Sequence, residues 1–356
     1  MGGERRTTMR SRRLWILLPL LGVALAAVPA RSAPALEGVP RFDHVAVLIL
    51  ENQNFDSSWG PASVAHYLNS QLRPQGVFDD QYFGTGHVSL DNYIAMVSGQ
   101  PWNPLSGSDC AAVNLWICVQ PQSLFSHGRN IADQLENNGR SWKGYMDGMP
   151  SPCFHASYSP TALPPDPYQG NSTKAPAKDY ADRHNPFIYF ADIIGNAARC
   201  KAHDVPYTQL AGDLAANALP SFSFITPDTC HDGHDSPCAN GQPGGLTSAD
   251  AWLRNEVPSL LNYLNTHNGL LLITFDENGV TDGPPFGCCE GGPGPLPGFG
   301  GRVGLLALGA GLTAGKVVHT SYDHASLLRT LEDAFGITTH LNGASGSSSM
   351  SALFTP

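Results

Sequence analysis

Continuous apolar segments alternate with amphipathic ones along the chain. Four apolar segments are bounded by turn-forming residues, and they span residues 44–50, 221–226, 269–275 and 302–309. Such segments are typical of strands that are buried on both faces of a sheet. Residues 248–267 and 323–336 instead place apolar side chains at helical spacing, and each segment begins with a Ser or an Asp suited to capping a helix. The pattern predicts an α/β fold, a three-layer sandwich with helices on both faces of a mainly parallel central sheet.

Three long connections separate these elements. Residues 100–125, 147–180 and 278–300 are rich in Gly, Pro, Ser and Asn. Loops of this length inside a compact domain are usually binding loops or lids. The chain has no internal repeat and no evident domain boundary, so we expect residues 37–356 to form one domain with insertions.

The first 33 residues have the pattern of a signal peptide. Five arginines precede the apolar run "LWILLPLLGVALAAV", and the small residues of "PARSAPA" follow it. The run has about 15 residues, fewer than the ~20 that a spanning helix needs, which disfavours the alternative of a retained membrane anchor. "SRRLWIL" also resembles a twin-arginine export signal. We therefore expect a secreted or periplasmic protein without stable membrane insertion after cleavage.

Composition and charge narrow the class of protein. The chain has 356 residues, of which 42% are hydrophobic and 14% charged, so it can bury one large core. The formal net charge of -10 argues against electrostatic binding to nucleic acid or to an anionic membrane surface. The composition leaves the oligomeric state open.

The cysteines fit an exported protein. Two pairs lie close together in loop-like sequence and predict local disulfides, and a third pairing is longer in range. These expected pairs are Cys110 with Cys118, Cys230 with Cys238, and Cys153 with Cys200. The last two of the eight cysteines, Cys288 and Cys289, are left unassigned.

Acidic and amide side chains follow two of the predicted strands directly. Glu51 and Asn52 come after residues 44–50, and Asp276 and Glu277 come after residues 269–275. The carboxyl ends of parallel strands meet at one edge of a sheet, so these side chains should converge there. Carboxylates gathered in one cleft repel one another unless a proton or a cation neutralises them. The two pairs together favour a metal site over ordinary loop-initiating residues.

A third loop strengthens this interpretation. The segment "PDTCHDGHDSPC" follows the strand at 221–226 and contains two histidines and three aspartates: Asp228, His231, Asp232, His234 and Asp235. Imidazoles and carboxylates together suit zinc, iron or manganese. The segment by itself leaves open which of these side chains binds the ion.

Ser89 is a candidate nucleophile. It precedes "LDNYIAMVSG", a segment with the pattern of a helix, and therefore lies near a helix N-terminus. Free backbone N–H groups at that end can bind an anion, and a nearby metal would lower the pKa of the hydroxyl. The alternative is that Ser89 simply caps the helix.

These stretches resemble, in order, the motifs of the bacterial phosphoesterase family that contains secreted acid phosphatases and phospholipases C. The matching segments are "LILENQNFD", "HVSLDNYIAMVSG", "YADRHNPFIYF", "CHDGHD", "LLITFDENG" and "YDHASLLRTLEDAFG". The family is similar in fold to the alkaline phosphatase superfamily, so the resemblance implies an alkaline-phosphatase-like fold and a phosphoesterase catalytic domain over residues 37–356. Asp91 stands where the family often has Pro.

The resemblance also implies roles for individual residues. Ser89 would be the nucleophile, and a divalent or transition metal ion (zinc, iron, manganese or calcium) would be held by Glu51, Asn52, Ser89, Asp232, Asp276 and Glu277. Three histidines would line the phosphate pocket, complete the metal shell or protonate the leaving group: His184, His234 and His324.

The function that we expect is that of a metal-dependent acid phosphatase, which hydrolyses small phosphate monoesters through a phosphoserine. The alternatives are a phospholipase C acting on lipid headgroups and a non-catalytic binding protein on the same fold. The three long loops contain few lysines or arginines, so we expect phosphate to be bound by the metal and histidines without an arginine clamp. Recognition beyond the phosphate should then be loose, with an activity optimum below neutral pH.

Overall fold

The computed structural model describes residues 1–3, 35–103, 106–109, 130–154, 179–238, 240–279 and 300–355. Its contacts divide the chain into Met1–Ala33 and Pro34–Pro356, and only the second unit is considered below. Residues 4–33 of the predicted signal peptide and the cysteines at 110, 118, 288 and 289 lie outside the described residues. Within the described ranges, no helix is both long enough and apolar enough to cross a membrane.

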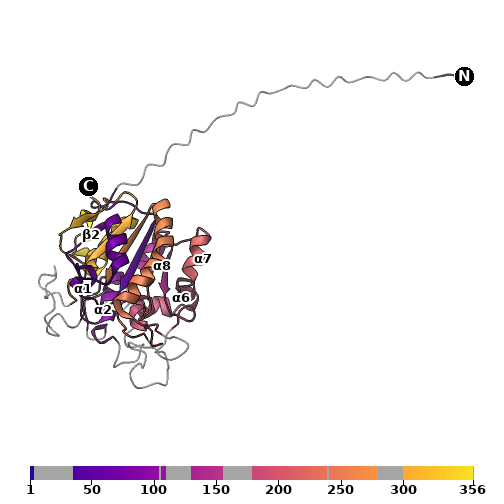
Figure 1. The fold of residues 1–356 in the computed structure, drawn as a ribbon. Coiled ribbons are helices and arrows are strands. Elements are labelled where there is room, and N and C mark those ends of the chain that lie inside the picture. Colours follow the sequence, from indigo (N-terminus) through magenta and orange to yellow (C-terminus); the bar gives the residue numbers. More distant parts are fainter. Residues whose placement is uncertain are drawn as a thin grey trace. The chain divides into compact units, whose positions relative to one another are not determined.

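A large sheet forms the centre of the second unit (Figure 1). Across the described residues its spatial order is β5 (Asp204–Pro206), β4 (Trp142–Met146), β6 (Phe222–Thr226), β1 (His44–Leu50), β7 (Gly269–Phe275), β8 (Leu305–Gly309), β2 (Val77–Asp79) and β9 (Lys316–Val318). The strands from β5 to β7 are parallel, whereas β8 runs antiparallel to both β7 and β2. The predicted mainly parallel sheet is confirmed.

The four predicted apolar segments correspond to β1, β6, β7 and β8. Three of them begin within one residue of the expected position, but β8 begins at Leu305 instead of residue 302. Gly304 precedes it with a φ of +70°, a left-handed conformation that interrupts extended backbone. A second, two-stranded sheet pairs β3 (Tyr82–Phe83) with β10 (Tyr322–Asp323).

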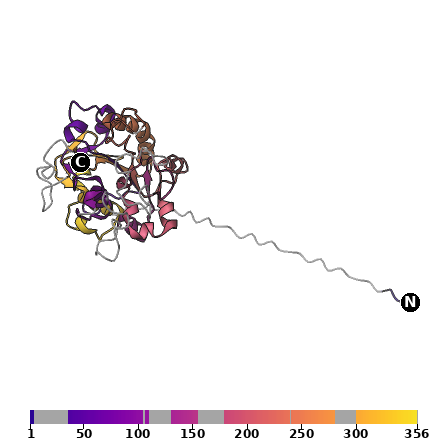
Figure 2. The ribbon, with the colours of Figure 1, turned by 90° about the horizontal axis from the view of Figure 1, so that it is seen from below.

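Helices cover both faces of the sheet (Figures 1 and 2). One group packs together and consists of α2 (Ser89–Ser98), α4 (Ile131–Asn137) and α9 (His324–Phe335). The long α8 (Gly245–Thr266) instead contacts β7, β8 and β1, together with α7 (Gln209–Ala215). Shorter helices are α1 (Phe55–Trp59), α5 (Ala191–Ile194), α6 (Ala197–His203), and the turns η1 (Leu68–Leu72), η2 (Arg73–Gln75), η3 (Ser106–Ser108), η4 (Asp182–His184), η5 (Pro186–Tyr189), η7 (Asn342–Ser345) and η8 (Ser351–Leu353).

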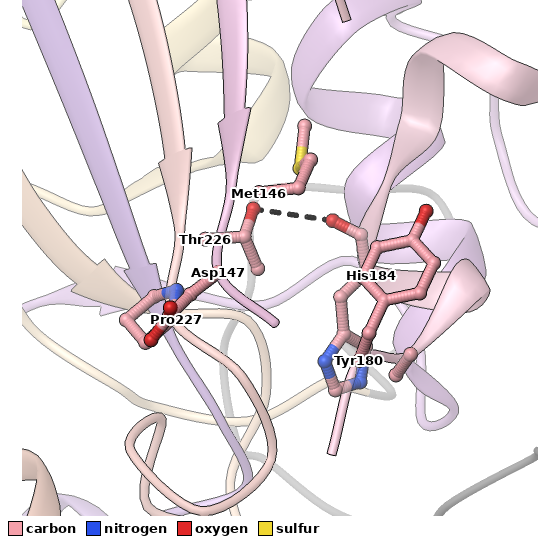
Figure 3. A pocket seen from close by; sticks show the side chains of 7 residues that line it. Met146, Asp147, Tyr180, His184, Thr226 and Pro227 are labelled. Atoms are coloured by element: carbon pink, nitrogen blue, oxygen red, sulfur yellow. Dashed lines mark hydrogen bonds between the residues drawn. The ribbon is translucent and has the colours of Figure 1, made fainter. Parts of the chain in front are cut away.

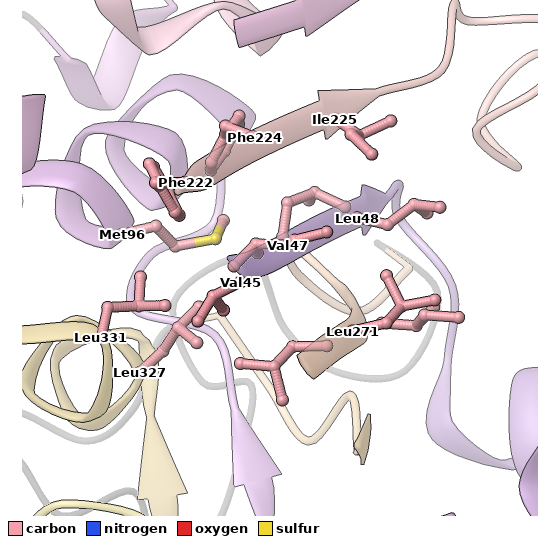
Figure 4. Packing of buried hydrophobic residues seen from close by; sticks show 14 of the residues in the cluster. Val45, Val47, Leu48, Met96, Phe222, Phe224, Ile225, Leu271, Leu327 and Leu331 are labelled. Carbon is pink, nitrogen blue, oxygen red and sulfur yellow. The ribbon is translucent and has the colours of Figure 1, made fainter. Parts of the chain in front are cut away.

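The hydrophobic core fixes α2 against the sheet. Figure 4 shows Met96 of α2 packing beside Val45 and Phe222, with Leu327 and Leu331 of α9 next to them. All five side chains are buried. The helix that begins at the candidate nucleophile is therefore held by close packing, which is the condition for a precisely placed reactive group.

Two of the predicted disulfides are present, and both lie beside the loops at the carboxyl ends of the strands. Cys153 bonds to Cys200 with a Cα–Cα distance of 5.4 Å, and Cys230 bonds to Cys238 with a Cα–Cα distance of 4.8 Å. Every described cysteine is thus paired. Disulfides of this kind persist in oxidising compartments.

The two disulfides should differ in their contribution to stability. The sequence separations are 47 residues for Cys153–Cys200 and 8 for Cys230–Cys238. Because cross-linking a longer loop removes more entropy from the unfolded chain, we expect a loss of ~4 kcal/mol for Cys153→Ser with Cys200→Ser and ~2.5 kcal/mol for the other double variant. Urea unfolding of the two double variants and the wild type measures both losses. Equal losses, or the reverse order, would contradict this ranking.

Candidate active site

Three strand ends meet at one edge of the sheet, as predicted. The Glu51 amide at the end of β1 donates to the carbonyl of Asp232 at 2.8 Å, which ties the loop after β6 to β1. On the other side, the Asn52 amide donates to Asp276 Oδ1 at 3.0 Å, which ties the end of β7 to β1. The three acidic or histidine-containing loops of the sequence analysis are therefore neighbours in space.

Three carboxylates in this region are fully buried. Glu51, Asp232 and Asp276 are each 0% exposed. Burial raises the pKa of Glu51 well above its usual value, and the charge of Asp276 raises it further. Burial likewise raises the pKa of Asp232, with Glu51 adding to the shift, and that of Asp276, with Glu277 adding to it. These carboxylates need a counter-charge if they are to ionise together.

Several buried atoms here make no hydrogen bond to any described residue. They are one oxygen of each carboxylate and the amide oxygen of Asn52: Glu51 Oε1, Asp232 Oδ2, Asp276 Oδ2 and Asn52 Oδ1. A buried polar atom without a partner costs about 1–3 kcal/mol, so several in one place require an explanation. Carboxylate and amide oxygens are suitable ligands for a divalent cation. The residues present fit such an ion.

His184 lies between two of these carboxylates. Its Nε2 is 3.2 Å from Glu51 Oε1 and its Nδ1 is 3.3 Å from Asp232 Oδ2, but neither contact has hydrogen-bond geometry. The ring stacks on Tyr93 of α2, with the ring centroids 5.2 Å apart. Burial and the charge of Arg183 lower the pKa of His184 well below its usual value, so its imidazole is neutral. A neutral imidazole beside carboxylates can add a nitrogen ligand.

Ser89 is the first residue of α2 and does not cap it. The N-cap position belongs to Val88, which makes no side-chain capping bond. The Ser89 hydroxyl instead donates to Glu51 Oε2 at 3.0 Å, and the residue is 4% exposed. The capping alternative is therefore wrong, since the hydroxyl is directed at the carboxylate cluster. The hydroxyl therefore has a carboxylate in contact that can accept its proton.

Glu277 differs from Asp276 because protein groups contact both of its carboxylate oxygens. Asn52 Nδ2 donates to Oε1 at 3.2 Å, and His87 Nδ1 contacts Oε2. Because Asn52 uses its Nδ2 in this contact, its Oδ1 does not bond to Glu277. Asn52 Oδ1 is one of the unpartnered atoms described above. Glu277 and Asn52 were predicted from the sequence as site residues, but His87 was not. The position of His87 in the segment "HVSLDNYIAMVSG", two residues before Ser89, could have indicated that it belongs to the site.

The two remaining candidate histidines have different surroundings. His324 is fully buried: its Nε2 donates to the carbonyl of Asp276 at 2.7 Å, and Tyr82 donates its hydroxyl to Nδ1 at 2.8 Å. Burial lowers the pKa of His324 to about 4. His234 is 32% exposed, and its Nδ1 lies 2.8 Å from Asp235 Oδ1. His324 thus supports the backbone that carries Asp276, whereas His234 is the more exposed of the two.

The structure also separates the members of the loop after β6. Asp232 joins the site, whereas His231 pairs with Asp228 at 2.7 Å and with Asp147 at 3.3 Å. These two carboxylates raise the pKa of His231 to about 10. Cys230 lies close to His231 and Asp228, but its sulfur is committed to the disulfide and cannot bind a metal as a thiolate.

Asp91 does not place a charge beside the nucleophile at neutral pH. It is fully buried, and no described residue makes a hydrogen bond to either of its carboxylate oxygens. Burial, with the charge of Asp109 adding to it, raises the pKa of Asp91 to about 8. The side chain is therefore protonated at pH 7, which removes the conflict with a phosphate that an acidic residue at this position would create.

Arg183 was missed by the sequence analysis. It is 5% exposed, and its charge faces Asp109, Glu51 and Asp232. Its Nη1 is buried without a hydrogen-bond partner. We expected a site without an arginine because only the lysines and arginines of the three long loops were considered. Arg183 lies a few residues after the second of these loops. Its position directly before His184 in "YADRHNPFIYF" was the available signal.

A small pocket lies next to this cluster and shares His184 with it (Figure 3). The other lining residues come from the ends of β4 and β6 and from the segment before η4: Met146, Asp147, Tyr180, Ala181, Thr226 and Pro227. The Thr226 hydroxyl donates to the carbonyl of His184 at 3.2 Å and so anchors the backbone of η4.

Comparisons with known proteins agree with this geometry. The model of the Phosphoesterase family matches residues 62–338. A probable acid phosphatase of Kluyveromyces lactis is 28% identical over 256 residues, which cover 72% of this chain and 52% of that protein. A phosphatidylinositol-3-phosphatase of Mycobacterium tuberculosis is 25% identical over 332 residues, which cover 91% of this chain and 90% of that protein.

The chain spans about half the length of the Kluyveromyces relative. Among solved structures, a protein in the alkaline phosphatase superfamily from Vibrio parahaemolyticus aligns with a TM-score of 0.53 at 14% identity, covering 90% of this chain and 75% of that one. This likeness confirms the predicted fold class, and at this identity it extends no further than the fold.

Proposed function

Because this chain belongs to the Phosphoesterase family, we propose that it hydrolyses phosphate monoesters through a phosphoserine formed on Ser89. The observation that carries the proposal is the Ser89 hydroxyl, which donates to buried Glu51 inside a group of carboxylates. A hydroxyl with a proton acceptor in contact is the arrangement that covalent catalysis requires.

The residues that would hold a divalent cation are Glu51, Asn52, Asp232, Asp276 and His184. When bound there, the ion supplies positive charge that favours ionised Ser89 and stabilises charge on the phosphate oxygens. Glu277 and His324 position this set through Asn52 and through the carbonyl of Asp276. Relative to the sequence-based roles, His184 moves to the metal and His324 to a supporting position.

The reaction has two steps. In the first, Ser89 Oγ bonds to phosphorus while the bond from phosphorus to the alcohol oxygen breaks. The proton of Ser89 passes to Glu51 Oε2, and the departing alcohol takes a proton from His234. In the second step a water oxygen bonds to phosphorus, the bond from Ser89 to phosphorus breaks, His234 takes the proton from water, and Glu51 returns its proton to Ser89.

His234 is proposed as the acid because its surroundings differ from those of the other two histidines. His184 and His324 are both fully or almost fully buried, whereas His234 is 32% exposed. Asp235 Oδ1 contacts one ring nitrogen, and among the described residues the other nitrogen makes no hydrogen bond. A carboxylate that orients an imidazole in this way supports proton transfer at the free nitrogen.

A monoester is favoured over a diester by charge. A phosphate monoester carries close to two negative charges at neutral pH, and a bound divalent cation and Arg183 are the positive groups that would face its oxygens. The Kluyveromyces and Mycobacterium relatives are both named as phosphatases. A phospholipase C would need a binding site for the second ester group of its diester substrate. The experiment described next tests this alternative alongside monoester hydrolysis.

We expect the purified protein to hydrolyse p-nitrophenyl phosphate faster than bis-p-nitrophenyl phosphate or phosphatidylcholine. The rate should be highest below neutral pH, because the first step needs a protonated general acid. A chelator should abolish the activity, and added divalent metal should restore it. Rates on the three substrates across pH, with and without chelator, measure all of this. Faster turnover of phosphatidylcholine would assign the protein to the phospholipases C, and no turnover of any ester would favour a binding protein.

A further inference from the structure

Two donors beside Ser89 converge on the carboxylate of Asp109. Asp109 Oδ1 accepts a hydrogen bond from the amide of Leu90 at 2.8 Å, and Leu90 follows Ser89 directly in α2. Asp109 Oδ2 lies 3.9 Å from Arg183 Nε. Backbone N–H groups at a helix N-terminus and an arginine are the groups that proteins use to bind phosphate oxygens. We name the Leu90 amide and the Arg183 guanidinium the anion cradle.

Arg183 provides independent evidence that the anion cradle is built for a larger anion than a carboxylate. Its side chain is 6% exposed, and its buried Nη1 has no hydrogen-bond partner in the part of the chain that the structure describes. The contact from Nε to Asp109 is longer than a hydrogen bond. A carboxylate offers two oxygens in one plane, whereas a phosphate offers three around a centre. Asp109 therefore occupies the anion cradle without satisfying it.

Asp109 is the more exposed member of this pair. Its side chain is 21% exposed, compared with 6% for Arg183. Asp109 is electrostatically coupled to its neighbours: it raises the pKa of Asp91 and of Glu277, and His234 acts on Asp109 in turn. A phosphate that enters the anion cradle would meet the charge of Asp109 at close range.

We propose that Asp109 is an internal competitor for the phosphate group, an inference that rests on the proposed function. Its carboxylate holds the place of the phosphate oxygens on Leu90 and Arg183, and the substrate must displace it to reach Ser89. Asp109 thereby weakens the binding of both the substrate and the phosphate product. It sets the working concentration of the substrate and speeds release of inorganic phosphate, which would otherwise inhibit the enzyme.

Asp109→Asn tests the competition directly. The amide is close in size to the carboxylate and can still accept from Leu90, but it carries no charge against phosphate. We expect the Kd of inorganic phosphate, measured by titration calorimetry on the metal-replete protein, to fall at least roughly tenfold. The KM for p-nitrophenyl phosphate should fall in parallel. Asp109→Ala, which removes the acceptor altogether, should show the same direction.

The matched control is Asp192→Asn. Asp192 is a carboxylate paired with a partly buried arginine, Arg199, and neither residue belongs to the site. Its substitution should leave the Kd of phosphate and the KM unchanged. If both Asp109 variants are folded and bind phosphate no more tightly than the wild type, the competition does not exist. A fall in kcat without a change in KM would also overturn it, because Asp109 would then act in the chemistry.

The calorimetry separates this inference from the proposed function. Tighter phosphate binding by the Asp109 variants, in a protein that hydrolyses no ester, would uphold the anion cradle and reject the enzyme. Normal monoester hydrolysis together with unchanged phosphate affinity in the Asp109 variants would uphold the proposed function and reject the competition by Asp109.

Discussion

Ser89→Ala is expected to lower kcat for phosphate monoesters by roughly 10⁴-fold or more, the scale of loss when a covalent hydrolase loses its nucleophile. The hydroxyl is the only part of the side chain that changes, and it donates to Glu51 Oε2. The fold should persist, because Val88 holds the N-cap position and Ala is a good helix former. Steady-state kinetics and thermal unfolding measure the two effects.

Ser98→Ala is the matched control at the other end of the same helix. Its buried hydroxyl donates to the carbonyl of Ile94 at 2.7 Å, away from the carboxylates. We expect a small loss of stability and unchanged turnover. Acid quenching during hydrolysis of a ³²P-labelled monoester should leave label on the wild type and on Ser98→Ala but not on Ser89→Ala. Turnover by Ser89→Ala within a few-fold of the wild type would reject the phosphoserine.

Glu51→Gln and Asp276→Asn are each expected to lower bound metal and rate together, with the rate falling about 100-fold or more. Each substitution removes a buried negative charge whose second oxygen has no hydrogen-bond partner. Elemental analysis of the purified variants gives the metal content, and excess metal in the assay should restore part of the rate.

Glu332→Gln is the control for these charge changes. Glu332 is also fully buried, but it lies near the far end of α9, where its Oε1 accepts from the amide of Leu341 at 2.9 Å. Its substitution should leave the metal content unchanged. A wild-type protein without stoichiometric metal under any condition would contradict the metal site, as would variants of Glu51 and Asp276 that retain a full complement.

Much of the fold could be predicted because its signals are local. Continuous apolar runs predicted β1, β6, β7 and β8, and helical spacing predicted α8 and α9. The antiparallel direction of β8 and the short strands β2, β5 and β9 were not predicted. Strands of three residues contain too few positions for a periodicity, and the direction of a strand is set by its neighbours, which the strand's own sequence does not specify.

The location of the carboxylate cluster in the fold could also be predicted from the sequence. Glu51 and Asp276 follow strands that pair in parallel, so a general property of such sheets brings them to one edge. The sequence likewise identified Ser89 as a residue at the start of a helix. The roles of the histidines could not be obtained in this way, because the difference between His234 and His324 lies in their burial and hydrogen-bond partners.

By itself, the sequence determined the order of the longer strands and helices and the sheet edge that carries the acidic loops. It led us to expect the two disulfide pairings that the structure describes but did not fix them. Only the tertiary structure decided that the Ser89 hydroxyl donates to Glu51 instead of capping its helix, and that His324 donates to the carbonyl of Asp276. It also decided that Asp109 lies between Arg183 and the amide of Leu90. The physical reason is that periodicity and strand direction act over a few residues along the chain, whereas the protonation and partner of a buried polar group depend on side chains that distant segments bring to it.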